Sequence, residues 1–186
     1  RRKVSEAGVS FRHAHGKHIS QADWDFFYQC YERTYLEHGN APYLTPDFFN
    51  YMRQEMADQW LLFVAEREGH PIACSLIGIH HEDERPTVAY GRYWGALERV
   101  DCLHFEACYY QPLAWCIEQG VQRFEGGAQG EHKMARALMP VSTHSAHWLA
   151  DARFAQAVEN FLEREGHGVG HYLAHLEERN PFKKQP

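Results

Sequence analysis

The chain has 186 residues, of which 44% are hydrophobic and 14% aromatic, and its formal net charge is −6. This length suits one domain with a substantial core, and the composition excludes an intrinsically disordered chain. The acidic balance argues against a general binder of nucleic acid or anionic membranes, because contact with phosphate needs a basic surface, and no segment approaches the roughly 18 apolar residues of a membrane span.

The first third of the chain predicts one strand and two helices. Residues 9–13 fit a short opening strand. Ser20 and Asp23 have the spacing of a capping box, which predicts a helix that begins after Ser20 and ends near Gly39. Thr45 followed by Pro46 predicts the start of a second helix, because threonine caps well and proline is favoured at the first helical position.

The middle of the chain is rich in predicted strands. Residues 60–65 are a continuous apolar run, and a turn at 68–71 separates them from a second apolar run at 72–79, which predicts a hairpin. The polar residues 80–86 predict a loop, and residues 87–94 a third strand.

A helix is predicted over residues 103–119, with Gly120 ending it in the left-handed conformation. Pro112 lies inside this helix and predicts a kink, because proline removes one backbone hydrogen bond. Residues 121–126 then predict a fourth core strand that leads directly into a loop rich in glycine.

The last third predicts a short helical turn at 134–139, a final strand at 142–149 and a long helix at 151–178 that is broken near 166–170. Hairpin strands thus precede a strand–helix–strand crossover. This order predicts the α/β class, with a mixed central sheet and helices on both of its faces.

The segment FEGGAQGEHK at 124–133 concentrates residues that can carry chemistry. Its glycines permit close approach of the backbone, so Gly126 and Gly127 are candidates to meet a carbonyl group. The alternative is a solvated surface turn. The segment supplies two candidate catalytic bases and two further candidate binding residues, which are Glu131, His132, Gln129 and Lys133.

On the predicted strand 87–94, alternation places Tyr90, Arg92 and Trp94 on one side. An arginine between aromatic residues suits a carboxylate or phosphate, which makes these three residues candidates for substrate binding. The alternative is an arginine that packs over aromatic rings at the surface of the sheet.

His104 and Glu106 fall in the first turn of the next predicted helix, where the helix dipole favours a neutral histidine and an ionised carboxylate. Either residue is a candidate general base, and Tyr110 shares a face with Glu106 as a candidate binding residue. The alternative for His104 is a partly buried histidine that is already satisfied.

Metal binding is weighed because the chain has 14 histidines. Histidines cluster at 13–18 and 80–81, and others recur at every fourth position over 167–175. A solvated helix face fits the last pattern better, because no cysteine or second acidic cluster completes a metal site, and no metal is expected. The five cysteines form no CxxC pair, which favours reduced thiols and a cytoplasmic protein.

Several runs resemble a known family. The runs are YGRYWG at 90–95, HFEACYYQ at 104–111, EGGAQGEHK at 125–133 and PV at 140–141 with SAHW at 145–148. They resemble a bacterial group of predicted N-acyltransferases, related to Fem-like proteins and labelled peptidoglycan biosynthesis or recognition. The resemblance implies the GNAT fold for residues 1–186 as a single domain. It also implies that the chain is the C-terminal half of a longer protein of two domains.

The resemblance further implies transfer of an acyl or aminoacyl group to an amine, with a small-molecule or peptide-like substrate linked to peptidoglycan precursors. The donor would be acyl-CoA or aminoacyl-tRNA. The junction at 95–102 has one glycine and lacks the Gly-x-Gly turn that holds the pyrophosphate of CoA in GNAT enzymes, while the acidity of the chain disfavours tRNA. Two alternatives stay open: a half that recognises a ligand without catalysis, and an acetyl-CoA enzyme with a divergent loop.

Overall fold

The computed structural model describes residues 1–127, 133–134, 138–141 and 143–178. Contacts divide the chain into two compact units, Arg1–Ala128 and Gln129–Pro186, where the sequence predicts one domain. The first unit holds the sheet and the helices packed on it. In the described part of the second unit, the long helix α6 is the main element.

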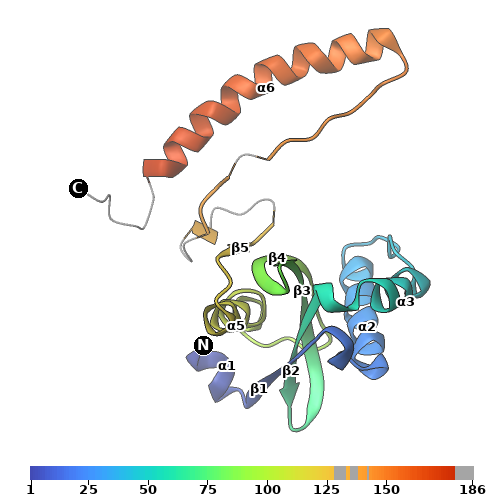
Figure 1. The fold of residues 1–186 in the computed structure, drawn as a ribbon, viewed down its shortest axis with the longest axis vertical. Coiled ribbons are helices and arrows are strands. Elements are labelled where there is room, and N and C mark those ends of the chain that lie inside the picture. Colours follow the sequence, from blue (N-terminus) through green and yellow to red (C-terminus); the bar gives the residue numbers. More distant parts are fainter. Residues whose placement is uncertain (128–132, 135–137, 142, 179–186) are drawn as a thin grey trace. The chain divides into compact units, whose positions relative to one another are not determined.

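The first unit is built on a five-stranded sheet in the order β1-β2-β3-β4-β5 (Figure 1). The first four strands are antiparallel neighbours, and β5 runs parallel to β4, so the predicted mixed sheet is confirmed. The strands are β1 Val9–His15, β2 Trp60–Arg67, β3 His70–Glu82, β4 Arg85–Ala96 and β5 Arg123–Glu125.

Two tight hairpins connect β2, β3 and β4. Glu68 and Gly69 form the first turn with φ of 53° and 78°, and Asp83 and Glu84 form the second with φ of 48° and 64°. Such turns match the right-handed twist of the flanking strands. The prediction of a loop at 80–86 is therefore wrong, because only Asp83 and Glu84 lie outside the strands. The sequence shows no sign of this tight turn, since neither of its two central residues is glycine.

One face of the sheet is covered by α2 (Gln21–Glu37) and α3 (Pro46–Glu55), as Figure 1 shows. The capping box predicted at Ser20 and Asp23 is confirmed, with the Ser20 side chain accepting from the Asp23 N–H. Rings from both helices meet Leu62 and other apolar residues of β2 and β3 in one core cluster.

The opposite face is covered by α1 (Arg2–Glu6), α4 (Leu103–Phe105) and α5 (Gln111–Gln119). Alternate residues of β2 point to the two faces, since Leu61 and Phe63 contact the α5 cluster whereas Leu62 and Val64 contact the α2 cluster. Helices therefore lie on both faces, as predicted. Two short 3-10 helices, η1 (Gly16–His18) and η2 (Ala57–Gln59), lead to α2 and β2.

The helix predicted at 103–119 is present but irregular. A π-helical turn, η3 (Glu106–Tyr110), separates α4 from α5, and Pro112 lies in the first turn of α5. The disturbance predicted from Pro112 thus takes the form of a widened turn, a feature that is frequent at functional sites. Gly120 ends α5 with φ of 70°, as predicted.

The C-terminal predictions are partly wrong. β5 has three residues and is half-exposed or exposed, so it is not a core strand. Residues 143–149 form no strand in the described part of the chain. α6 (Ala152–Glu178) runs unbroken through the glycines at 166–170, which accept helical φ angles despite a cost of about 1 kcal/mol each. The turn predicted at 134–139 lies largely outside the described residues.

Candidate functional site

A β-bulge at Arg92 interrupts β4. Leu76 of β3 pairs with Tyr93, but the next residue, Ile77, pairs with Gly91, so Arg92 has no partner across the strand. Bulges re-aim side chains and are common beside active sites.

The bulge changes which side chains share a face. A Cβ added at Gly78 of β3 would lie 3.7 Å from Arg92 Cγ and 3.8 Å from both Tyr90 Cβ and Trp60 Cζ3, so these side chains surround Gly78. Trp94 points the other way, with its ring 5.4 Å from that of His104. The prediction that Tyr90, Arg92 and Trp94 share a face is therefore wrong for Trp94, because the extra residue shifts the alternation.

Arg92 is exposed, and its guanidinium carbon lies 5.7 Å from the centre of the Tyr93 ring. Tyr93 is itself held by rings of α2 and α3, among them Tyr31 at 5.5 Å. Within the described ranges, Arg92 forms no ion pair. A cation seated on an aromatic ring and turned to solvent suits an anionic group of a ligand.

The glycines after β5 lie beside the bulge. Tyr90 pairs with Glu125 across the parallel strands, and a Cβ added at Gly91 would lie 3.5 Å from the Glu125 carbonyl oxygen. Gly127, with φ of 75°, approaches the Gly91 carbonyl in the same way, at 3.6 Å. The structure thus brings the predicted strand and the start of the predicted glycine loop together, and the main chain there is bare of side chains.

The rest of that loop lies mostly outside the described residues, and this includes Gln129, Glu131 and His132. Lys133 is described and half-buried. Gly126 and Gly127, which the sequence offered as candidates to meet a carbonyl group, lie beside the strand. The sequence did not single out Trp60 and Gly78, because only strand pairing brings them to Tyr90.

His104 lies on the opposite face of the sheet from Tyr90. Its ring sits among those of Trp94, Phe105 and Tyr109, at 5.4, 5.5 and 5.8 Å. This aromatic surrounding matches the alternative of a partly buried histidine, and it separates His104 from the face that carries Tyr90 and Arg92.

Glu106 is buried in the π-helical turn. Its Oε1 accepts hydrogen bonds from Arg1 Nε at 3.2 Å and Gln111 Nε2 at 2.8 Å. Arg1 also lies over the Tyr110 ring, at 5.8 Å from its centre. Glu106 and Tyr110 therefore belong to a second location, beside a cavity that α1 and β1 help to form.

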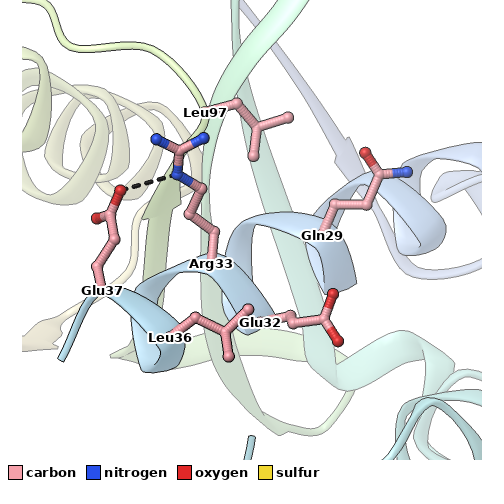
Figure 2. Close-up of a pocket in the computed structure, with 6 residues that line it drawn as sticks. All are labelled: Gln29, Glu32, Arg33, Leu36, Glu37 and Leu97. Atoms are coloured by element: carbon pink, nitrogen blue, oxygen red, sulfur yellow. Dashed lines mark hydrogen bonds and ion pairs between the residues drawn. The ribbon is translucent and has the colours of Figure 1, made fainter. Parts of the chain in front are cut away.

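Another cavity, of about 470 Å³, lies on the outer side of α2 (Figure 2). Glu32, Glu37 and Leu97 contribute to its lining, and its one arginine, Arg33, already pairs with Glu37 at 2.8 Å. The excess of carboxylates makes this cavity unsuited to a polyanion.

The junction between β4 and α4 is also unsuited to pyrophosphate. The N–H groups of Leu97 and Glu98 both donate to the Ile72 carbonyl oxygen, at 2.7 and 3.3 Å. These two groups are therefore already hydrogen-bonded within the protein. Glu98 pairs with Arg67, and Asp101 lies 3.8 Å from Lys3 Nζ. Two of the junction's N–H groups are therefore engaged and two of its side chains are carboxylates, which agrees with the missing Gly-x-Gly turn.

A histidine pair joins the two clusters that the sequence shows at 13–18 and 80–81. The rings of His15 and His81 stack at 5.7 Å, and Trp115 lies 5.8 Å from His15. Burial lowers the pKa of His15, against a hydrogen bond to the Asp58 carbonyl that raises it. The described ranges contain no group of three or more histidine, cysteine or acidic residues placed to hold a metal ion.

No described helix combines the length and hydropathy that a membrane crossing requires. Residues 1–184 match the protein family FemAB_like, described as peptidoglycan biosynthesis/recognition. No curated protein matches the chain.

Solved structures share the fold. A GCN5-related N-acetyltransferase from Ralstonia eutropha JMP134 has a TM-score of 0.56 at 17% identity, over 77% of this chain and 100% of that one. A predicted acetyltransferase with acetyl-CoA from Clostridium acetobutylicum has a TM-score of 0.53 at 12% identity, over 76% and 96%. The aminoglycoside enzyme AAC(6')-Iy, solved with a bisubstrate analogue, has a TM-score of 0.51 at 15% identity, over 77% and 97%. The expected GNAT-like fold is therefore confirmed.

Proposed function

We propose that this chain, which belongs to the FemAB-like family, is an N-acyltransferase whose reaction takes place at the edge between β4 and β5. The observation that carries the proposal is the approach of Gly126 and Gly127 to Gly91, directly beside the bulge at Arg92. The fold, which is one on which N-acetyltransferases are built, supports the same reaction class.

The chemistry needs few groups. The amine nitrogen attacks the acyl carbonyl carbon, the new C–N bond forms, the bond to the leaving sulfur or oxygen breaks, and the nitrogen loses one proton. In this proposal the bare main chain at Gly126 and Gly127 meets the carbonyl oxygen. Arg92 and Tyr90 bind the substrate. Glu131 and His132, which lie outside the described residues, stay the sequence's candidates for the proton acceptor.

The acceptor, in this proposal, is an amine of a peptidoglycan precursor, which the description of the family supports. Such precursors carry carboxylates and amide groups. The exposed guanidinium of Arg92, seated on Tyr93, is a suitable partner for a carboxylate of that kind.

Acyl-CoA and aminoacyl-tRNA can both supply the acyl group, but one observation speaks against each of them. Acyl-CoA held by a pyrophosphate turn is disfavoured, because the Leu97 and Glu98 N–H groups already bond to Ile72. Aminoacyl-tRNA is disfavoured by the net charge of −6. We therefore propose that the protein binds its donor mainly through the acyl end. This mode of binding needs neither a pyrophosphate turn nor a basic surface for tRNA.

The test is an assay with a lysine-containing muramyl peptide as acceptor and either acetyl-CoA or alanyl-tRNA as donor, with mass spectrometry of the peptide. We expect that only one of the two donors gives a product, and that this product carries one added acyl group on the lysine amine. Replacing the true base, Glu131→Gln or His132→Gln, should lower the rate by about 100-fold or more. Glu178→Gln, on the exposed end of α6, is the matched control and should leave the rate unchanged.

A second candidate function is recognition of the precursor without catalysis, by a half whose partner domain precedes it in a longer chain. Glu98 and Asp101, at the junction after β4, favour this candidate, because negative charges there disfavour the pyrophosphate of an acyl-CoA donor. Saturable binding of the muramyl peptide, without transfer from either donor, would support recognition and contradict the acyltransferase.

A further inference from the structure

The side chain of Glu125 lies at the β4–β5 edge and is not used by the proposed acyl transfer. Its neighbour Phe124 packs in the α5 cluster, so Glu125 points to the opposite face of the sheet. Tyr90, its cross-strand partner, points to that face as well, because it lies beside Trp60 of the α2 cluster around Gly78. Neighbouring strands lie about 4.8 Å apart, so the Glu125 and Tyr90 side chains are neighbours there.

Glu125 is accessible from solvent and has one partner. Its Oε1 pairs with Arg123 Nε at 3.0 Å, and its side chain is 31% exposed. Within the described part of the chain, the carboxylate has no hydrogen bond or ion pair besides this one. A carboxylate accepts about four hydrogen bonds, so Glu125 keeps acceptor capacity for a ligand while Arg123 orients it.

The place of Glu125 in the chain ties it to the bare main chain of the proposed site. Gly126 and Gly127 follow it directly, and its carbonyl oxygen lies 3.5 Å from the position of a Cβ added at Gly91. An attacking nitrogen must come within about 3–3.5 Å of the carbonyl carbon. A carboxylate one residue before these glycines is therefore well placed to hold the nitrogen that attacks.

The acceptor brings a positive charge to this edge. A lysine-type amine has a pKa of about 10.4, so it arrives as an ammonium group at neutral pH. An ammonium group forms its strongest hydrogen bonds with a carboxylate. The exposed carboxylate of Glu125 is therefore complementary to this substrate, whereas Arg92, on the same face, is not.

We propose that Glu125 binds the acceptor amine in its ammonium form, beside the glycines that meet the acyl carbonyl. This inference rests on the proposed function for its location, and it adds the group that selects an amine over an alcohol or an acylated amine, because neither of these carries the charge. The contact is non-covalent. Arg123 acts only through Glu125, as a positioning residue.

The test is calorimetric titration with a muramyl peptide that ends in L-lysine and with the same peptide acetylated on Nζ. The wild type should bind the lysine peptide at least about tenfold more tightly, because acetylation removes the charge. Glu125→Gln should weaken binding of the lysine peptide by at least about tenfold and leave binding of the acetylated peptide unchanged. Glu66→Gln is the matched control and should bind both peptides as the wild type does, since Glu66 is also half-buried and paired with an arginine, Arg12, at 2.6 Å.

Carbodiimide cross-linking of the wild type tests the same contact without a substitution, in case the Glu125 variant folds poorly. The reagent joins an amine to a carboxylate that touches it. Mass spectrometry should therefore find the peptide's lysine attached to Glu125, and the acetylated peptide attached to no carboxylate through that position.

The inference is overturned by absence of saturable binding, by equal binding of the two peptides to the wild type, or by cross-links to other carboxylates only. Unchanged binding of the lysine peptide by a folded Glu125→Gln overturns it as well, even where the wild type transfers an acyl group. The converse result separates the two proposals: charge-dependent binding at Glu125 without transfer from either donor supports this contact and contradicts the acyltransferase.

Discussion

Gly95 of β4 lies directly against Cys30 of α2. A Cβ added at Gly95 would be 2.3 Å from the Cys30 carbonyl oxygen and 2.6 Å from its carbonyl carbon, distances that no side chain tolerates. Beside this contact, the Thr34 hydroxyl lies 3.0 Å from the Cys30 carbonyl oxygen and 3.2 Å from that of Trp94. The absence of a side chain at Gly95 therefore fixes how closely α2 approaches the strand that carries Arg92.

Gly95→Ala should destabilise the protein, because backbone and not a flexible side chain occupies the space. We expect the free energy of unfolding to fall by about 2 kcal/mol or more. Gly166→Ala in α6, where nothing lies within 4 Å, is the matched control and should be neutral or stabilising by up to about 1 kcal/mol. Denaturant unfolding measures both, and a neutral Gly95→Ala would contradict the close contact.

Arg12 and Asp23 should make stability depend on pH. Burial, the largest influence, raises the pKa of Asp23, but hydrogen bonds from Arg12 and Ser20 and the charge of Arg12 outweigh it and bring the pKa below its usual 3.8. A carboxyl with a lowered pKa in the folded state stabilises the fold above its unfolded pKa, and this contribution is lost as pH falls through the folded pKa.

The comparison of wild type with Asp23→Asn isolates this contribution. The difference between their free energies of unfolding should be largest near neutral pH and should shrink as pH falls below about 4. Curves that stay parallel down to about pH 2 would show that Asp23 titrates alike in both states.

Ser75 should stabilise the π-helical turn. Its hydroxyl donates to the Ala107 carbonyl at 2.6 Å, and both residues are buried. Ser75→Ala leaves that carbonyl without this donor, so we expect a loss of about 1–2 kcal/mol. Ser10→Ala removes an exposed and longer bond to Glu66, at 3.5 Å, and should cost less than about 0.5 kcal/mol. Equal losses in the two variants would count against the role of Ser75.

The cysteines should differ in reactivity toward a thiol reagent. Burial raises the pKa of Cys74 well above its usual value and that of Cys116 to about 11, so these thiols should react only after unfolding. Cys102 is exposed and should react fast. Cys102→Ser should remove one thiol from the fast phase. Unchanged fast amplitude in that variant would disprove the assignment.

Arg92 should matter for activity and not for stability. Its guanidinium contacts the Tyr93 ring and is exposed, so Arg92→Gln should leave the melting temperature unchanged while lowering kcat/KM by about 10- to 100-fold. Arg85→Gln is the matched control, because Arg85 is also exposed on β4 but lies beside the hairpin turn. Similar activity of both variants would remove Arg92 from the proposed site.

Local signals predicted the helices well. Ser20 with Asp23, Thr45 with Pro46, and Gly120 each set a helix boundary that the structure confirms. Each of these signals works through backbone groups within a few residues, so the neighbouring sequence contains the whole interaction.

Features that depend on pairing across the sheet escaped prediction. Between the pairs Leu76–Tyr93 and Ile77–Gly91, β4 has one more residue than β3, and this extra residue, Arg92, forms the bulge. The bulge places Trp94 on the opposite face of the sheet from Tyr90. The same limit hid the Asp83-Glu84 turn, whose residues carry no glycine signal. The sequence of a single strand does not specify the register in which it pairs with its neighbour.

By itself, the sequence determined the order of the elements in the sheet unit and the mixed sheet, because periodicity and helix caps are local properties. Only the tertiary structure decided which candidates meet. It placed Gly126 beside Gly91, set Tyr90 and Arg92 around Gly78, and moved Glu106 into a cavity with Arg1. Those neighbours are far apart in the chain, and strand register and helix packing alone bring their side chains together.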